Sequence, residues 1–356
     1  MTDNPYVDAP DYRRWRKAIG QTPPSEVDPV TGLPFTIGRE DKIVSAGSCF
    51  AQHIARHLLQ NGFRYLVTET AHPVLPADTA EAFGYGQYSA RYGNIYTTRQ
   101  LLQLLRRAYG TFRPDDGVWA EGGRYYDPYR PAIQPGGFAT LKEFELDRDQ
   151  HLTAVRRAFE EMDVFIFTLG LTECWLSAVD GAAYPMCPGT VAGSFDPSRH
   201  VMVNLGVAEI VSDMQAFIEE LRAVNPAVKI VLTVSPVPLA ATAEDRHVLV
   251  STTYSKSVLR VAAEELRKIP NVAYFPSYEI VTGSFSRGQY FAPDLRNVTE
   301  DGVDHVMRLF FRHLAPGGHD HPIAAPAPSN DDYLDRMSTV IATICEEEQL
   351  DIPANE

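Results

Sequence analysis

The chain has 356 residues, of which 44% are hydrophobic, enough for one large globular domain with a sizeable core. Its formal net charge is −14 at pH 7, and because nucleic-acid binding needs a basic surface, we expect no nucleic-acid partner. No apolar run approaches the roughly 20 residues that cross a bilayer, and the first residues hold no apolar signal segment. The four cysteines form no CxxC pair or regular framework. Together these features indicate a reduced, cytoplasmic protein without a membrane span.

Short apolar segments bounded by turn or polar residues predict buried parallel strands along the chain. Amphipathic patterns lie between these segments and predict helices. Alternating strands and helices are typical of a three-layer α/β/α sandwich with a mainly parallel sheet, the fold class that we expect. The strands are expected at residues 42–46, 164–169, 229–234 and 272–275, with another near 63–68, and the helices at 51–60, 101–109, 147–161, 208–224 and 254–269.

Composition divides the chain into three parts. Residues 1–40 are rich in proline and predict an irregular arm around one short helix. Residues 41–315 form the expected α/β domain, with an insertion near 110–140 whose aromatic side chains could stack on a sugar ring or simply pack together. Residues 316–356 predict a linker followed by an amphipathic helix at 331–348.

The most informative stretch is the break between the first strand and the helix that follows it. The apolar strand at 42–46 ends at Gly47-Ser48, and the helix starts at once. Ser48 would then present its hydroxyl at the carboxyl end of a strand, beside helix N–H groups that favour negative charge. Such a corner can hold a nucleophile and part of an oxyanion site. In the alternative interpretation, Gly47 makes the turn and Ser48 merely caps the helix.

Residues 47–51 spell Gly-Ser-Cys-Phe-Ala, and this motif resembles the signature of the GSCFA family, whose members are similar to SGNH/GDSL-type hydrolases. Further motifs that look like that family follow in its order, so the resemblance covers roughly residues 40–312. The resemblance implies an SGNH-like fold and a serine enzyme that acts on esters. These further motifs are the runs YGNIYT at 92–97, LGLTE at 169–173, TVSPVP at 233–238, YSK at 254–256 and YFPSYE at 274–279.

By this resemblance Ser48 is the nucleophile, which needs a base to take its proton. The related hydrolases carry that base in an Asp-x-x-His motif after the last strand. Here Asp294 is present, but Asn297 occupies the histidine position, and an amide cannot accept and return a proton. His247, in the connection after the 229–234 strand, could compensate. So could His305, although its helical position points away from the apolar face and favours an exposed side chain.

Oxyanion stabilisation needs two or three hydrogen-bond donors. Backbone N–H groups at the serine corner and at Gly93 are candidates, and the Asn94 amide could add a donor or form an Asx turn. Thr172 stands where the related enzymes carry asparagine and could donate through its hydroxyl. Glu173 could orient a neighbour, act as an acid, or sit at a helix start. Lys256 could bind an anionic group or simply lie at a helix start.

The leading hypothesis is an SGNH-like serine hydrolase or acyltransferase that acts on ester-linked acyl groups, in particular acetyl groups of a carbohydrate or small molecule. A degenerate, non-catalytic member that binds a glycan or a protein is the alternative, motivated by the missing histidine. A thiol enzyme that uses Cys49 is a third possibility. The chain holds no HExxH, paired-cysteine, EF-hand, dinucleotide or Walker-type pattern, so we expect no metal and no cofactor.

Overall fold

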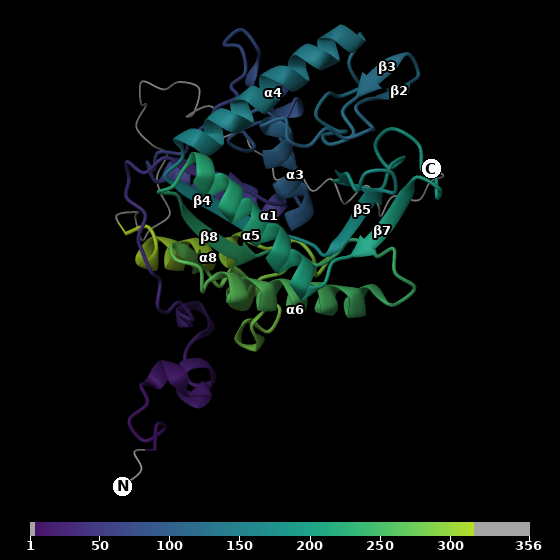
Figure 1. Cartoon of the computed structure of the whole chain (residues 1–356). Coiled ribbons are helices and arrows are strands. Elements are labelled where there is room, and N and C mark those ends of the chain that lie inside the picture. Colours follow the sequence, from purple (N-terminus) through teal and green to yellow (C-terminus); the bar gives the residue numbers. More distant parts are fainter. Residues whose placement is uncertain (1–3, 317–356) are drawn as a thin grey trace.

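A four-stranded parallel sheet lies at the centre of the protein, for which the computed structural model describes residues 4–316 (Figure 1). The strand order is β1-β4-β8-β9, and every neighbouring pair is parallel. The predicted parallel sheet is therefore confirmed, with strand bounds within one residue of those expected. The strands are β1 (Ile43–Ala46), β4 (Val164–Leu169), β8 (Lys229–Val234) and β9 (Val272–Tyr274).

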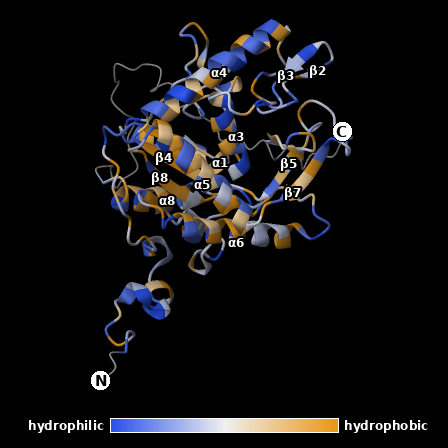
Figure 2. Ribbon diagram, in the orientation of Figure 1, coloured by the Kyte–Doolittle hydropathy of each residue, from blue (hydrophilic) through white to orange (hydrophobic). Residues whose placement is uncertain are grey.

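The sheet is covered on both faces, and this explains why its strands are apolar throughout. Side chains of β4 alternate between two cores, because Phe165 and Phe167 belong to one and Val164 and Ile166 to the other. The first core is completed by α3, α4, α5 and α6, and the second mainly by α1, α7 and α8. Figure 2 shows hydrophobic residues on the central strands and on the helices that pack against them. The sheet and the helices on its two faces thus form three layers.

The five predicted helices are found in place, although each begins earlier than expected, and α4 and α6 do so by the most. α4 begins at Leu141 because the Thr140 hydroxyl accepts a hydrogen bond from Glu143 N. α6 begins at Val248 because His247 Nδ1 accepts one from Leu249 N. The helices are α1 (Cys49–Gln60), α2 (Ala77–Ala82), α3 (Thr98–Ala108), α4 (Leu141–Glu161), α5 (Val207–Val224), α6 (Val248–Leu266), α7 (Ser277–Thr282) and α8 (Glu300–His313).

Two smaller sheets were not predicted. A three-stranded antiparallel sheet of order β6-β5-β7 follows β4, and Glu173 is the first residue of β5 rather than a helix start. A two-stranded sheet lies in the insertion. The strand expected near 63–68 is wrong, since only Tyr65 forms an isolated bridge, to Ile43. The added strands are β2 (Trp119–Glu121), β3 (Arg124–Tyr126), β5 (Glu173–Ser177), β6 (Ala183–Tyr184) and β7 (His200–Asn204).

The N-terminal arm has two parts with different surroundings. Its first part holds η1 (Asp11–Arg13) and η2 (Arg16–Gly20), buries none of their residues, and extends away from the body (Figure 1). After η3 (Pro24–Glu26) the arm packs on α8, where Val27 and Ile37 are each 1% exposed. The expectation of one short helix is therefore wrong. A further short helix, η4 (Ser284–Ser286), follows α7.

The predicted linker and terminal helix of residues 316–356 lie outside the described residues, apart from residue 316. Among residues 4–316, no helix combines the length and hydropathy that crossing a membrane requires.

Candidate active site

The corner between β1 and α1 is shaped by a close approach to β4. Gly47 has a φ of +149°, a conformation that side-chain-bearing residues rarely adopt. A Cβ at this position would lie 2.7 Å from Thr168 Cβ and 2.8 Å from Thr168 O. Only glycine therefore lets the end of β1 turn while it lies against the end of β4.

Ser48 occupies the N-cap position of α1 without capping the helix. Its backbone is extended, but its side chain makes no capping hydrogen bond. Within residues 4–316 the structure shows no hydrogen bond from this hydroxyl, and the hydroxyl is not among the fully enclosed polar atoms that lack a partner. Ser48 as a whole is 5% exposed. The side chain is therefore recessed, and its oxygen is not committed to a structural bond.

The loop at residues 93–97 is fixed to the ends of two neighbouring strands. Ile95 N donates to Gly47 O at 2.8 Å, and Leu171 N donates to Tyr96 O at 2.9 Å. A Cβ on Gly170 would lie 2.9 Å from that same Tyr96 oxygen, so glycine is needed at this contact. The structure therefore brings the predicted oxyanion loop to the serine corner and to the end of β4.

Asn94 is held in place by side chains that also touch the serine corner. It is 5% exposed, and its Oδ1 accepts hydrogen bonds from Tyr88 OH at 2.8 Å and from Gln52 Nε2 at 3.3 Å. The Tyr88 oxygen also lies 2.9 Å from Ser48 O and 3.1 Å from Gly47 O. Because Oδ1 faces Tyr88, the Nδ2 donor occupies the other side of the planar amide. Tyr88 and Gln52 were missed by sequence reasoning, since no motif marks them.

Thr172 and Glu173 lie at the same sheet edge and have different surroundings. Thr172 is fully buried, its backbone N donates to Ser255 Oγ at 3.2 Å, and its own hydroxyl is enclosed without a partner. The Glu173 carboxylate accepts hydrogen bonds from Thr242 Oγ1 at 2.5 Å and from Ala243 N at 2.9 Å. Glu173 therefore fixes the connection that follows β8.

His305 is taken up by structural contacts. It is 2% exposed, so the prediction of an outward-pointing side chain is wrong. Its Nε2 lies 3.0 Å from Val27 O, a pure acceptor, and its Nδ1 lies 2.8 Å from Tyr290 OH. Burial lowers the pKa of His305 to about 4, so the ring is neutral near pH 7. The helix pattern could not show that the arm covers this side of α8.

His247 and Asp294 do not form the expected relay. His247 is exposed and caps α6 through Nδ1, at 3.1 Å from Leu249 N. The Asp294 carboxylate accepts hydrogen bonds from Arg296 N, Asn297 N and Asn297 Nδ2, at 3.0, 3.0 and 2.7 Å. The bond from Arg296 N contributes most to a lowered pKa of Asp294. No histidine within residues 4–316 pairs with Asp294, which instead orients Asn297.

A buried cation lies at this edge. Lys256 is 1% exposed, lies well inside α6 rather than at its start, and donates from Nζ to Gly170 O at 2.8 Å. Its position among apolar residues on one helical face was the signal that could have located it. Thr168 and Thr233, paired in register on β4 and β8, add two enclosed hydroxyls without partners. In the described part of the chain, no group of three or more His, Cys, Asp or Glu side chains could hold a metal ion.

No curated protein and no solved structure matches this chain. The sequence model of the GSCFA family does match it, over residues 42–310. That range runs from the start of β1 into α8 and includes the serine corner, the loop at 93–97, Lys256 and Asp294. The match covers well over half of the 356 residues, and the chain therefore belongs to the GSCFA family.

Proposed function

We propose that the protein is a serine-dependent enzyme that hydrolyses or transfers ester-linked acyl groups, in particular acetyl groups of a carbohydrate. The observation that carries this proposal is the uncommitted Ser48 hydroxyl at a strand-to-helix corner, with Asn94 fixed alongside it. The resemblance of the sequence motifs to SGNH/GDSL-type hydrolases supports the same chemistry. The carbohydrate preference rests on that resemblance and on the aromatic side chains of the insertion at residues 110–140.

In the proposed reaction Ser48 Oγ attacks the ester carbonyl carbon. The bond from Oγ to the acyl carbon forms, the alcohol leaves with a proton, and the acyl group passes to water or to a second hydroxyl. In this proposal N–H groups at the start of α1 and the Asn94 amide stabilise the negative charge on the carbonyl oxygen. The arrangement resembles other serine enzymes in role, without their aspartate–histidine pair.

We assign the proton transfer to His247. Both ring nitrogens of His305 are engaged, whereas Nε2 of His247 makes no hydrogen bond within the described residues. Because Nδ1 of His247 accepts from Leu249 N, the neutral ring carries its proton on Nε2, so the ring must give up this cap and move its proton to Nδ1 before Nε2 can accept the Ser48 proton. The connection that carries His247 leaves the carboxyl end of β8 and is anchored to β5 through Glu173. A His247→Gln change should therefore lower turnover by about 10²- to 10⁴-fold, the usual contribution of a general base. Unchanged turnover would remove His247 from this role.

The nucleophile is tested with a fluorophosphonate probe, with the adduct located by mass spectrometry. We expect labelling at Ser48, and we expect Ser48→Ala to lose both labelling and turnover of p-nitrophenyl acetate and acetylated oligosaccharides. Ser277→Ala is the matched control, because Ser277 is also a buried serine with an unpartnered hydroxyl, at the start of the helix that follows β9 of the same sheet. Labelling elsewhere, together with full turnover in Ser48→Ala, would reject the proposal.

A non-catalytic member that binds a glycan is the second candidate. The observation in its favour is that Asp294 is satisfied by Asn297 and that His305 serves the fold. Saturable binding of saccharides by calorimetry, without turnover on the ester panel, would support this candidate. Turnover that Ser48→Ala abolishes would exclude it.

A further inference from the structure

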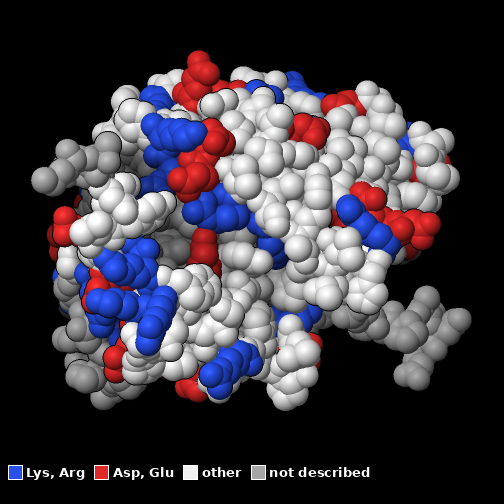
Figure 3. Space-filling model, turned by 90° about the horizontal axis from the view of Figure 1, so that it is seen from below, with Lys and Arg blue, Asp and Glu red and all other residues white. Residues whose placement is uncertain are grey.

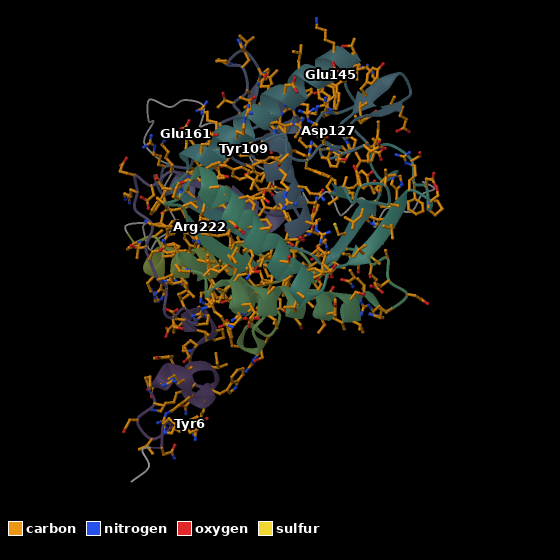
Figure 4. All side chains as sticks on the ribbon, in the orientation of Figure 1. Tyr6, Tyr109, Asp127, Glu145, Glu161 and Arg222 are labelled. Atoms are coloured by element: carbon orange, nitrogen blue, oxygen red, sulfur yellow. The ribbon has the colours of Figure 1, made fainter. Side chains whose placement is uncertain are left out.

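A pocket of about 620 Å³ lies between the end of α3, the insertion and α4. This volume is within the range of small-molecule sites. Tyr109 lines the pocket and is labelled in Figure 4 on the side of the molecule that α4 covers. Side chains of Phe112, Tyr129 and Leu152 add apolar and aromatic surface. The pocket could therefore enclose the organic part of a small ligand.

Four arginines line this pocket, against one acidic residue, Asp149. The positive charge of Arg107 is compensated by Asp127, whose carboxylate lies 3.9 Å away, and its guanidinium group also lies over the Tyr129 ring. The other three are Arg113, Arg148 and Arg156. The pocket thus carries more positive than negative side chains.

The three remaining guanidinium groups have no carboxylate partner within 4.0 Å among residues 4–316. Arg148 donates to Gly117 O at 3.1 Å, and Arg156 has only the Thr153 hydroxyl at 3.4 Å. Arg113 has neither a hydrogen bond nor an ion pair within this part of the chain. Three arginine side chains therefore line one cavity with no carboxylate within 4.0 Å of their guanidinium groups among residues 4–316.

Several arginines elsewhere in the chain are paired with a carboxylate. Arg106 binds Glu220 at 2.7 Å, and Arg260 binds Glu279 at 2.7 Å. On the face that Figure 3 shows, basic and acidic side chains are interspersed in the same way. The three pocket arginines have no carboxylate partner of this kind within residues 4–316, and an anion is a partner that would compensate their charge.

We propose that the arginine pocket binds the phosphoryl group of a small molecule, with Arg113, Arg148 and Arg156 as its ligands. Guanidinium groups bind phosphate through two parallel hydrogen bonds, and several of them match its two negative charges. The aromatic wall formed by Tyr109 and Phe112 would contact the organic part. Binding to this pocket can be measured without any turnover, so the proposal can fail or succeed independently of the proposed ester chemistry.

The pocket shares two lining residues with a small cavity of about 20 Å³ that lies next to it. Arg107 and Tyr129 line both, and Asn94 also lines the small cavity. A ligand in the arginine pocket would therefore contact two side chains that line the same small cavity as Asn94.

Calorimetry with phenyl phosphate and inorganic phosphate tests the proposal on the full chain. We expect saturable binding of phenyl phosphate, and we expect Arg113→Gln and Arg156→Gln each to weaken it at least about tenfold, as loss of a charge-assisted hydrogen bond does. Both side chains are exposed, so the variants should fold. Arg157→Gln is the matched control, because Arg157 neighbours Arg156 on α4 but pairs with Glu161 outside the pocket.

No saturable binding of either compound would overturn the proposal, and so would equal weakening by Arg157→Gln. Tighter binding of phenyl phosphate than of inorganic phosphate supports an organic phosphate as the ligand. Equal affinities would overturn the organic part and identify free phosphate as the occupant. A substituted pocket that still binds phenyl phosphate with unchanged affinity would exclude the arginines as its ligands.

Discussion

Replacing Gly47 by alanine tests whether the close approach of β1 and β4 defines the serine corner. A φ of +149° costs a side-chain-bearing residue about 1–3 kcal/mol, because this part of the φ/ψ map is nearly restricted to glycine. The new methyl group would also lie 2.7 Å from Thr168 Cβ and 2.8 Å from a backbone oxygen, which cannot rotate away. Forcing a group into a packed site adds about 1–3 kcal/mol. We therefore expect Gly47→Ala to lower the free energy of unfolding by about 2–6 kcal/mol.

Guanidinium denaturation, with linear extrapolation to water, measures this difference. Gly181→Ala is the control, because Gly181 has a φ of +72° but no heavy atom within 4 Å of a Cβ placed there. That variant should lose only the conformational term of about 1–2 kcal/mol. If Gly47→Ala is no more destabilised than Gly181→Ala, the contact with Thr168 does not constrain the corner and the reasoning fails.

Three further predictions concern the same edge and its supports. Tyr88→Phe removes the hydroxyl that binds Asn94, so we expect about 1 kcal/mol less stability and slower fluorophosphonate labelling of the protein; unchanged labelling would show that Asn94 needs no such support. Lys256→Met leaves Gly170 O without its donor, which should cost about 1–3 kcal/mol in denaturation experiments, and a variant as stable as the wild type would contradict this role. His305 has a folded pKa of about 4 against 6.5 when unfolded, so its contribution is complete above pH 6.5 and is lost as the pH falls toward 4. Denaturation at pH 7 and pH 5 should show lower stability at pH 5, and equal stability would argue against a buried neutral ring.

The central sheet could be predicted from the sequence because strands buried on both faces consist almost entirely of apolar residues. Val164–Leu169 is apolar at nearly every position, since its side chains face cores on both sides. The strand β5 could not be found in this way. Glu173–Ser177 is short, alternates in burial, and starts with a charged residue that the fold uses to anchor a loop. Local patterns of this kind do not separate a strand from a helix start.

The candidate site was predicted in part, and what could not be predicted are the tertiary contacts between residues far apart in the sequence. Ser48 and Asn94 were expected at one sheet edge because both follow strands or lie in connections there, and the structure ties their loops together. Tyr88, which makes that tie, carries no sequence signal. The surroundings of His305 could not be predicted from local sequence patterns either, because its partner Val27 lies 278 positions away in the sequence. Helical periodicity describes only the face that packs on the sheet.

The N-terminal arm divides at about residue 27, and this has a consequence for how the protein can be shortened. Val27 and Ile37 are buried against α8, and Ile37 N donates to Leu314 O at 2.7 Å. Removing residues 27–37 would uncover one side of α8 and leave the ring of His305 without its carbonyl acceptor, Val27 O. Removing η1 and η2 would expose nothing, since none of their residues is buried. Limited proteolysis should accordingly remove the first twenty or so residues and stop before the buried segment at residues 27–37.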